Sequence, residues 1–218
     1  MFVGHLAVGF AGKRLAPKTS LGTLLLASQL ADVVWPVLIL TGVEHARITP
    51  GITAASPLDL YDFPYSHSLL MDVVWAGLFA GAYYVARRYS RGAWVLFATV
   101  VSHWVLDWLS HRPDMQLAPG APARYGMGLW NSIPLTLAVE GAMWIAGVAV
   151  YLRSTKARDR VGAAGFWPMI VLLSAIWLGS IFGPPPPDAR AAALSALAMV
   201  AIFAWAYWID QHRPAIAE

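Results

Sequence analysis

Residues 102–111, SHWVLDWLSH, hold three ionisable side chains at intervals of four residues: His103, Asp107 and His111. An α-helix turns once in about 3.6 residues, so these side chains fall on one helical face. The surrounding segment, residues 91–111, has the length and apolar composition of a membrane-spanning helix. Ionisable groups at that depth are costly unless they pair, line a wet cavity or bind a metal. Imidazole and carboxylate on one face are typical of metal ligation.

The composition of the whole chain is that of a membrane protein. Of its 218 residues, 58% are hydrophobic and 12% are charged, whereas a soluble domain carries roughly 25% charged residues. Cysteine is absent, which excludes disulfides, thiolate metal ligands and cysteine nucleophiles. The net charge of +3 comes from basic residues in short loops. This pattern indicates membrane orientation, and no nucleic-acid partner is expected.

Six segments are apolar and long enough to cross roughly 30 Å of hydrocarbon, which predicts an all-α, polytopic integral membrane protein. They lie near residues 20–43, 66–87, 91–111, 128–152, 166–183 and 190–209. The apolar residues 2–11 are too few to span, and we expect a short re-entrant or half-length helix there. With no repeat and no second domain, residues 1–218 form a single transmembrane domain. Its metal-site half is residues 1–113, and its additional helices lie in residues 128–209.

Basic residues are concentrated in alternate loops. They cluster on the side of the C-terminus, within residues 13–18, 87–91 and 153–160. The opposite loops are poor in Lys and Arg: residues 44–65, 112–127 and 184–189. The positive-inside rule therefore predicts a cytoplasmic C-terminus. The four consecutive prolines 184–187 predict a stiff turn on the outer side.

Further ionisable residues are expected at similar depths. Counted at 1.5 Å per residue from the cytoplasmic ends of straight helices, Asp32 and His103 lie about 18 Å into the membrane, and Glu140 about 20 Å. Others fall in the same region or slightly above it: His5, Asp107, His67 and Asp72. We expect these residues to share one polar site.

This set of residues has two possible interpretations. A single intramembrane His is often a hydrogen-bonded link between helices, and Asp32 could simply pair with a basic group. The set as a whole favours metal, because no Lys or Arg lies in the interior of the expected spans to balance the carboxylates. The acidic residues of the outer loops are expected to be exposed or near a cavity mouth: Glu44, Asp59, Asp62 and Asp114.

The order of four short motifs resembles a known family. These are Gly4-His5, Asp32 at the end of QLAD, Ser66-His67-Ser68, and Ser102-His103-x-x-x-Asp107. They resemble the bacterial membrane-bound metal-dependent hydrolase family, which is distantly similar to zinc-dependent phospholipase C. The resemblance stops near Pro113 and implies a multi-pass hydrolase of the bacterial inner membrane. The chain departs from the family after Asp32, where a second Asp and a His are usual.

The expected site is a divalent metal, with zinc preferred and manganese or iron as alternatives. Its expected ligands are His5, Asp32, His67, His103 and Asp107. The metal would lower the pKa of a bound water toward ~7. Glu140 would accept the proton of that water, and His111 would contact substrate or act as general acid.

The expected function is hydrolysis of a lipid or lipid-linked ester or phosphoester within the bilayer. The alternative is a metal-ion or proton-coupled transporter, which would also place carboxylates and histidines at the midplane. A non-catalytic scaffold is a third and weaker option. The substrate and the oligomeric state are left open by the sequence.

Overall fold

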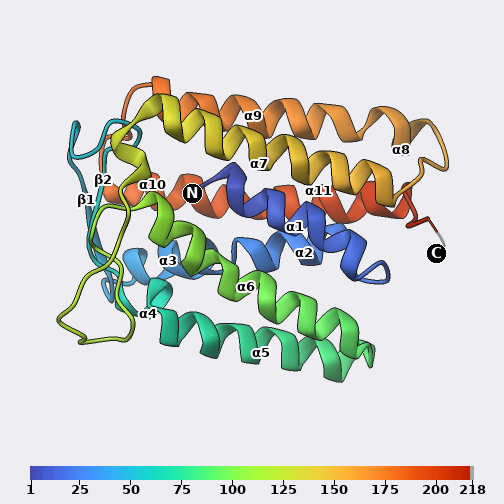
Figure 1. Cartoon of the computed structure of the whole chain (residues 1–218), viewed down its shortest axis with the longest axis horizontal. Coiled ribbons are helices and arrows are strands. Elements are labelled where there is room, and N and C mark those ends of the chain that lie inside the picture. Colours follow the sequence, from blue (N-terminus) through green and yellow to red (C-terminus); the bar gives the residue numbers. More distant parts are fainter. Residues whose placement is uncertain (217–218) are drawn as a thin grey trace.

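The structure, a computed structural model that describes residues 1–216, is almost entirely helical. The helices run side by side along the long axis of the molecule (Figure 1). Their bounds are α1 Val3–Leu15, α2 Leu21–Ser28, α3 Leu30–Leu40, α4 Pro64–His67, α5 Leu69–Arg87, α6 Ser90–Ser110, α7 Ile133–Ser154, α8 Arg160–Ala164, α9 Phe166–Phe182, α10 Ala189–Ala198 and α11 Val200–Gln211. The all-α prediction is confirmed.

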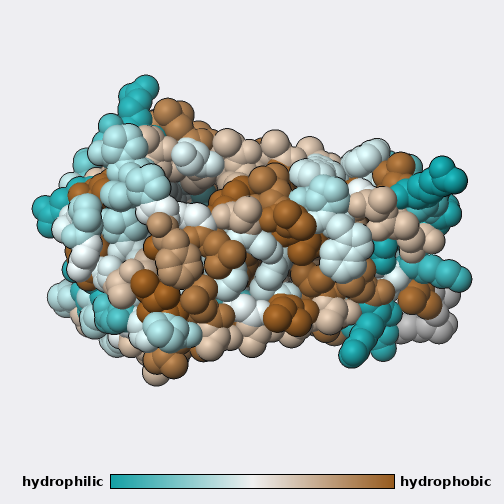
Figure 2. Space-filling model, turned by 90° about the horizontal axis from the view of Figure 1, so that it is seen from above, coloured by the Kyte–Doolittle hydropathy of each residue, from teal (hydrophilic) through white to brown (hydrophobic). Residues whose placement is uncertain are grey.

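Five helical stretches of the described chain are long and apolar enough to cross a membrane: α5, α6, α7, α8 with α9, and α10 with α11. A sixth is counted if α2 and α3 form one span, bent by 57°. Hydrophilic side chains gather at the two ends of the long axis, and hydrophobic ones predominate between them (Figure 2). The chain therefore has the helices of a membrane protein.

The expected straight span over residues 20–43 is wrong in one respect, because the helix breaks at Gln29. Ser20 begins α2 by accepting a hydrogen bond from Thr23 N. After the break, α3 continues in a new direction and carries Asp32 in its first turn. The break therefore sets where Asp32 points, which a depth count along a straight helix cannot give.

Another predicted span, residues 128–152, begins five residues late. Gly128 adopts a left-handed conformation with φ 74°, and a 3-10 turn, Leu129–Asn131, follows it. Ser132 then caps α7 by accepting a hydrogen bond from Leu135 N. The apolar residues before Ser132 belong to a loop at the end of the bundle.

The half-length N-terminal helix lies inside the bundle. The N-terminus of α1 lies part-way along the long axis, beside α7 and α2 (Figure 1). Phe10 is fully buried, with its ring edge-on to Trp144 at 5.4 Å between centroids. Gly147 permits the close approach of α7, since a Cβ there would lie 2.5 Å from Ala7 O. α1 is therefore an interior element of the fold.

The two ends of the bundle differ in their structure. The C-terminus and the basic loops lie at one end, on the right in Figure 1. The other end carries the α6–α7 loop and an antiparallel hairpin of β1, His45–Ile48, and β2, Leu58–Asp62, which the sequence did not predict. The predicted division of the loops agrees with this arrangement. Which end faces the cytoplasm stays a prediction.

Near the basic end, one pair of charges is buried. Lys13 Nζ lies 2.7 Å from Asp210 Oδ2 and donates a second hydrogen bond to Thr19 O. Tyr151 donates to the other oxygen of Asp210 at 3.3 Å. Asp210, just beyond the expected span 190–209, is therefore a buried carboxylate that has a basic partner.

Candidate metal centre

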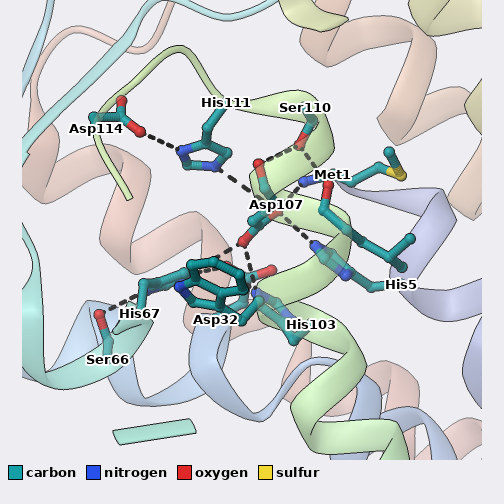
Figure 3. Close-up of polar contacts among 12 residues, drawn as sticks. Met1, His5, Asp32, Ser66, His67, His103, Asp107, Ser110, His111 and Asp114 are labelled. Atoms are coloured by element: carbon teal, nitrogen blue, oxygen red, sulfur yellow. Dashed lines mark hydrogen bonds and ion pairs between the residues drawn. The ribbon is translucent and has the colours of Figure 1, made fainter. Parts of the chain in front are cut away.

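Six side chains from four helices and one helix end meet inside the bundle (Figure 3). All six are candidates from the sequence: His5 on α1, Asp32 on α3, His67 on α4, His103 and Asp107 on α6, and His111 directly after α6. Five of them are at least 95% buried. Asp32 differs, because its side chain is 40% exposed.

Asp107 is the central member of the cluster, and its two oxygens face different imidazoles. Oδ1 lies 2.9 Å from His5 Nε2 and 3.7 Å from His111 Nε2. Oδ2 lies 3.1 Å from His103 Nε2 and 3.8 Å from His67 Nε2. A carboxylate placed in this way can ligate through either oxygen or bridge two cations.

Asp32 supplies a second carboxylate. Its Oδ1 lies 3.4 Å from His67 Nε2 and 3.8 Å from His103 Nε2. Ligand atoms lie within 4.8 Å of one another in two groups that share His103: His5, His103 and Asp107, and Asp32, His67 and His103. These buried groups could hold a metal ion through mixed nitrogen and oxygen ligands.

The hydrogen bonds of His67 determine which ring nitrogen carries its proton. Ser66 Oγ donates to Glu44 Oε2 at 2.6 Å, because an ionised carboxylate can only accept. With its single proton used there, Ser66 Oγ accepts the 2.7 Å hydrogen bond from His67 Nδ1. His67 therefore directs its other ring nitrogen, Nε2, toward Asp32, and in a neutral ring that atom carries the lone pair.

His103 and His111 follow the same logic. His103 Nδ1 donates to Ser28 O at 2.9 Å, since a carbonyl only accepts. His111 Nδ1 donates to Asp114 Oδ1 at 3.1 Å. Metal-ligating histidines usually have such an acceptor on the distal nitrogen, which fixes the tautomer. The Nε2 atoms of all three rings thus face carboxylate oxygens. With neutral rings these atoms carry lone pairs, and together with the carboxylates they would offer mixed nitrogen and oxygen ligands to a cation.

His5 completes the cluster from α1. Its ring stacks on that of His103, with 3.7 Å between centroids and 6° between planes. Its Nδ1 is buried without a hydrogen-bond partner among residues 1–216. The α-amino nitrogen of Met1 lies 2.5 Å from Asp107 Oδ1, so a positive group faces one side of the cluster. Asp107 Oδ2 and Asp32 Oδ1 face the ring nitrogens of His67 and His103.

Two other candidates lie outside these groups. Glu140 is buried on α7, and its Oε2 accepts the backbone N–H of Phe2 at 3.0 Å, at the start of α1. Asp72 on α5 is fully buried, and its oxygens have no hydrogen-bond partner in the part of the chain that the structure describes. Neither carboxylate belongs to the two groups of ligand atoms.

A cavity of about 340 Å³ adjoins the cluster. Asp32, His67, Asp107 and His111 line it, and Glu140 lines it as well. Most of the remaining lining is apolar and comes from α3, β2, α9, α10 and α11, including Val33, Leu60, Ile176, Ile181, Met199 and Phe203. The candidate ligands are therefore accessible from an apolar space.

Comparison with known proteins identifies no relative. No protein-family model, curated protein or solved structure matches the chain. The functional assignment therefore depends on the chemistry of the site.

The sequence interpretation missed two acidic residues next to the site. Glu44 and Asp59, which the sequence predicts to be exposed or near a cavity mouth, are 1% and 2% exposed, and neither lines the cavity. Glu44 also accepts the backbone N–H groups of Tyr65 and Ser66, at 2.7 and 2.8 Å. Asp59 bonds Arg112 and, at 2.5 Å, Arg47. No local pattern links Glu44 to Ser66, 22 residues later, so the contact is visible only in the fold.

Proposed function

We propose that the chain is a membrane-embedded, metal-dependent hydrolase that acts on a lipid or lipid-linked ester or phosphoester. One observation carries the proposal: the Nε2 atoms of His67 and His103 face oxygens of Asp32 and Asp107 beside an apolar cavity. With neutral rings, these groups would form a mixed nitrogen and oxygen ligand set for a divalent cation. The partial exposure of Asp32 leaves the cluster accessible for water or substrate.

The residues divide into ligands and groups that handle protons. His5, Asp32, His67, His103 and Asp107 hold the metal, with zinc preferred over manganese or iron. When bound there, the metal would polarise a substrate oxygen and make a nearby water more acidic. Glu140 faces the same cavity and accepts a proton there. His111, whose Nδ1 is held by Asp114, contacts the substrate or donates a proton to the leaving group.

The order of the motifs up to Pro113 supports this assignment through its resemblance to the bacterial membrane-bound metal-dependent hydrolases. By the same resemblance the protein belongs to the bacterial inner membrane. The clustering of basic loops at one end supports a cytoplasmic C-terminus. The cavity then lies toward the outer end of the bundle.

A metal-ion or proton-coupled transporter is the alternative, and the buried carboxylate of Asp72 beside the cluster favours it. A transporter must expose its site to both sides in turn. Within residues 1–216, the cavity is lined by residues from the outer and middle parts of the bundle. Toward the basic end, the Lys13–Asp210 pair and Tyr151 fill the interior. This one-sided access favours the hydrolase.

The test is a screen of lipid esters and phosphoesters with purified protein, beside a liposome assay of ion flux. We expect metal-dependent hydrolysis by the wild type. We expect Glu140→Gln to retain metal and lose turnover, because the amide can still accept the Phe2 N–H but cannot take a proton. Metal-dependent flux without hydrolysis of any lipid would identify a transporter. Full turnover in Glu140→Gln would show that Glu140 is not the proton acceptor and only accepts the backbone N–H of Phe2 at the start of α1.

A further inference from the structure

The cavity beside the metal centre extends between two consecutive helices, α9 and α10. Its lining includes Ile176 and Ile181 on α9, and Ala192 and Ala196 on α10. Pro184 and Pro186, from the turn that joins these helices, line it as well. α10 packs mainly against α3. The stiff proline turn therefore joins two helices whose facing sides enclose a space.

The rim of this space lies on the surface that faces lipid. Ile176 and Ser180 on α9, and Ser195 on α10, line the cavity and are also exposed. Ile176 lies six residues before the end of α9, and Ser195 six residues after the start of α10. At 1.5 Å per residue, both lie about 9 Å from the outer helix ends. The opening is thus at the depth of the hydrocarbon.

The rim is apolar in character despite its two serines. Ser180 Oγ donates to Trp177 O at 2.7 Å, and Ser195 Oγ donates to Ala191 O at 2.9 Å. Both hydroxyl protons are thus used within their own helices, and no charged side chain of the described chain lines this part of the cavity. An alkyl chain could pass without displacing a bound polar group.

We infer that the space between α9 and α10 is a binding site for one acyl chain of a phospholipid, which enters sideways from the bilayer. This inference deepens the proposed function, on which the assignment of the lipid as substrate depends. The cavity volume of about 340 Å³ exceeds twice the roughly 150 Å³ that accommodates one benzene molecule. It suits a single chain. The ester or phosphoester end of the same lipid then lies toward Asp32 and His67, which line the polar end of the cavity.

The experiment uses the purified full chain in phosphatidylcholine nanodiscs. The probe is a phosphatidylcholine with a photoactivatable diazirine in the middle of one acyl chain. Adducts are mapped by mass spectrometry of peptides. We expect labelling concentrated on residues 176–181 and 192–199, above the labelling of exposed lipid-facing positions such as Leu78 on α5. Labelling spread evenly over the lipid-facing helices would overturn the inference.

A matched pair of variants sharpens the result. Ala196→Trp places an indole in the cavity and should reduce labelling about ten-fold. Ala198→Trp adds the same group on the same helix at an exposed position outside the cavity, and should leave labelling unchanged. Equal labelling in both variants contradicts the site. The mapping on wild-type protein does not depend on either variant folding.

Two further arms separate the possible outcomes. In one arm, an excess of a polyisoprenyl phosphate competes with the probe, and in the other, unlabelled phosphatidylcholine competes at the same concentration. If only the polyisoprenyl phosphate abolishes labelling, the site binds an isoprenoid chain and the inference of an acyl chain is wrong. The labelling itself needs no turnover. Concentrated labelling without hydrolysis therefore leaves the chain site standing while the proposed function fails.

Discussion

His5 and His103 lie face to face, with 3.7 Å between ring centroids, although 98 residues separate them in the sequence. One ring comes from the interior helix α1 and the other from the spanning helix α6. Two protonated imidazoles would repel strongly at this distance in a buried site. The stacking therefore favours at least one neutral ring, which is the form that ligates a metal.

The first prediction concerns metal content. The purified protein should carry a transition metal, and His103→Ala or Asp107→Ala should weaken its affinity by more than about 100-fold, because each removes a ligand. His45→Ala is the control, since His45 is exposed and bonds Asp62 away from the cluster. Elemental analysis after gel filtration measures the outcome. An unchanged metal content in both His103→Ala and Asp107→Ala would show that the metal is bound at another site.

The second prediction concerns Glu44, which contacts the cluster through Ser66. Glu44→Ala should weaken metal affinity about 10–100-fold, because Ser66 loses its acceptor and no longer orients His67. Ser66→Ala should have a similar effect. The double variant should lose little more than either single one, since both act through one chain of hydrogen bonds. Additive losses would show that Glu44 acts by another route. Titration with zinc or manganese in competition with a chelator provides the affinities.

The third prediction concerns pH. Protons compete with the metal for ring nitrogens and carboxylates, so affinity should fall as the pH drops below about 6.5, the ordinary pKa of an imidazole. The loss should be reversed on return to neutral pH. Metal content measured between about pH 8 and pH 5 tests this, and a constant content across that range would contradict ligation by histidine.

A fourth prediction concerns the buried pair at the basic end. Lys13→Ala should destabilise the protein by about 3 kcal/mol, because it leaves Asp210 buried without its cation. Replacing both members, Lys13→Met with Asp210→Leu, should recover much of that loss. Thermal unfolding in detergent compares the variants. Metal content should be unchanged, since the pair does not contact the cluster.

A fifth prediction concerns orientation. The chain has no cysteine, so a single cysteine introduced at Lys156 or Ala123 reports the side of one loop. Both positions are exposed, and the loops that contain them, after α7 and after α6, lie at opposite ends of the bundle. An impermeant thiol reagent applied to intact cells should label Ala123→Cys and not Lys156→Cys. The reverse pattern would show that the predicted orientation is wrong and that the cavity lies toward the cytoplasmic side.

The sequence predicted those parts of the fold and site that depend on local spacing. The four-residue intervals from His103 to His111 indicate one helical face, and apolar length indicates the spans. The break at Gln29 was not predicted, because no proline or glycine marks it. Nor was the contact of Glu44 with Ser66, which depends on the β1–β2 hairpin. Such contacts depend on tertiary packing, for which the sequence carries no periodic signal.

The position of α1 has a consequence for how the protein is assembled. His5 leaves the ribosome more than a hundred residues before α7, the helix that packs against α1. A 13-residue helix is too short to insert stably across a bilayer by itself. α1 can be held inside the membrane only after α7 has been inserted. His5, although it comes first in the sequence of the cluster, is therefore one of the last of its residues to reach a fixed position. Any metal held by this cluster would therefore be loaded late in biogenesis, after most of the chain has been inserted.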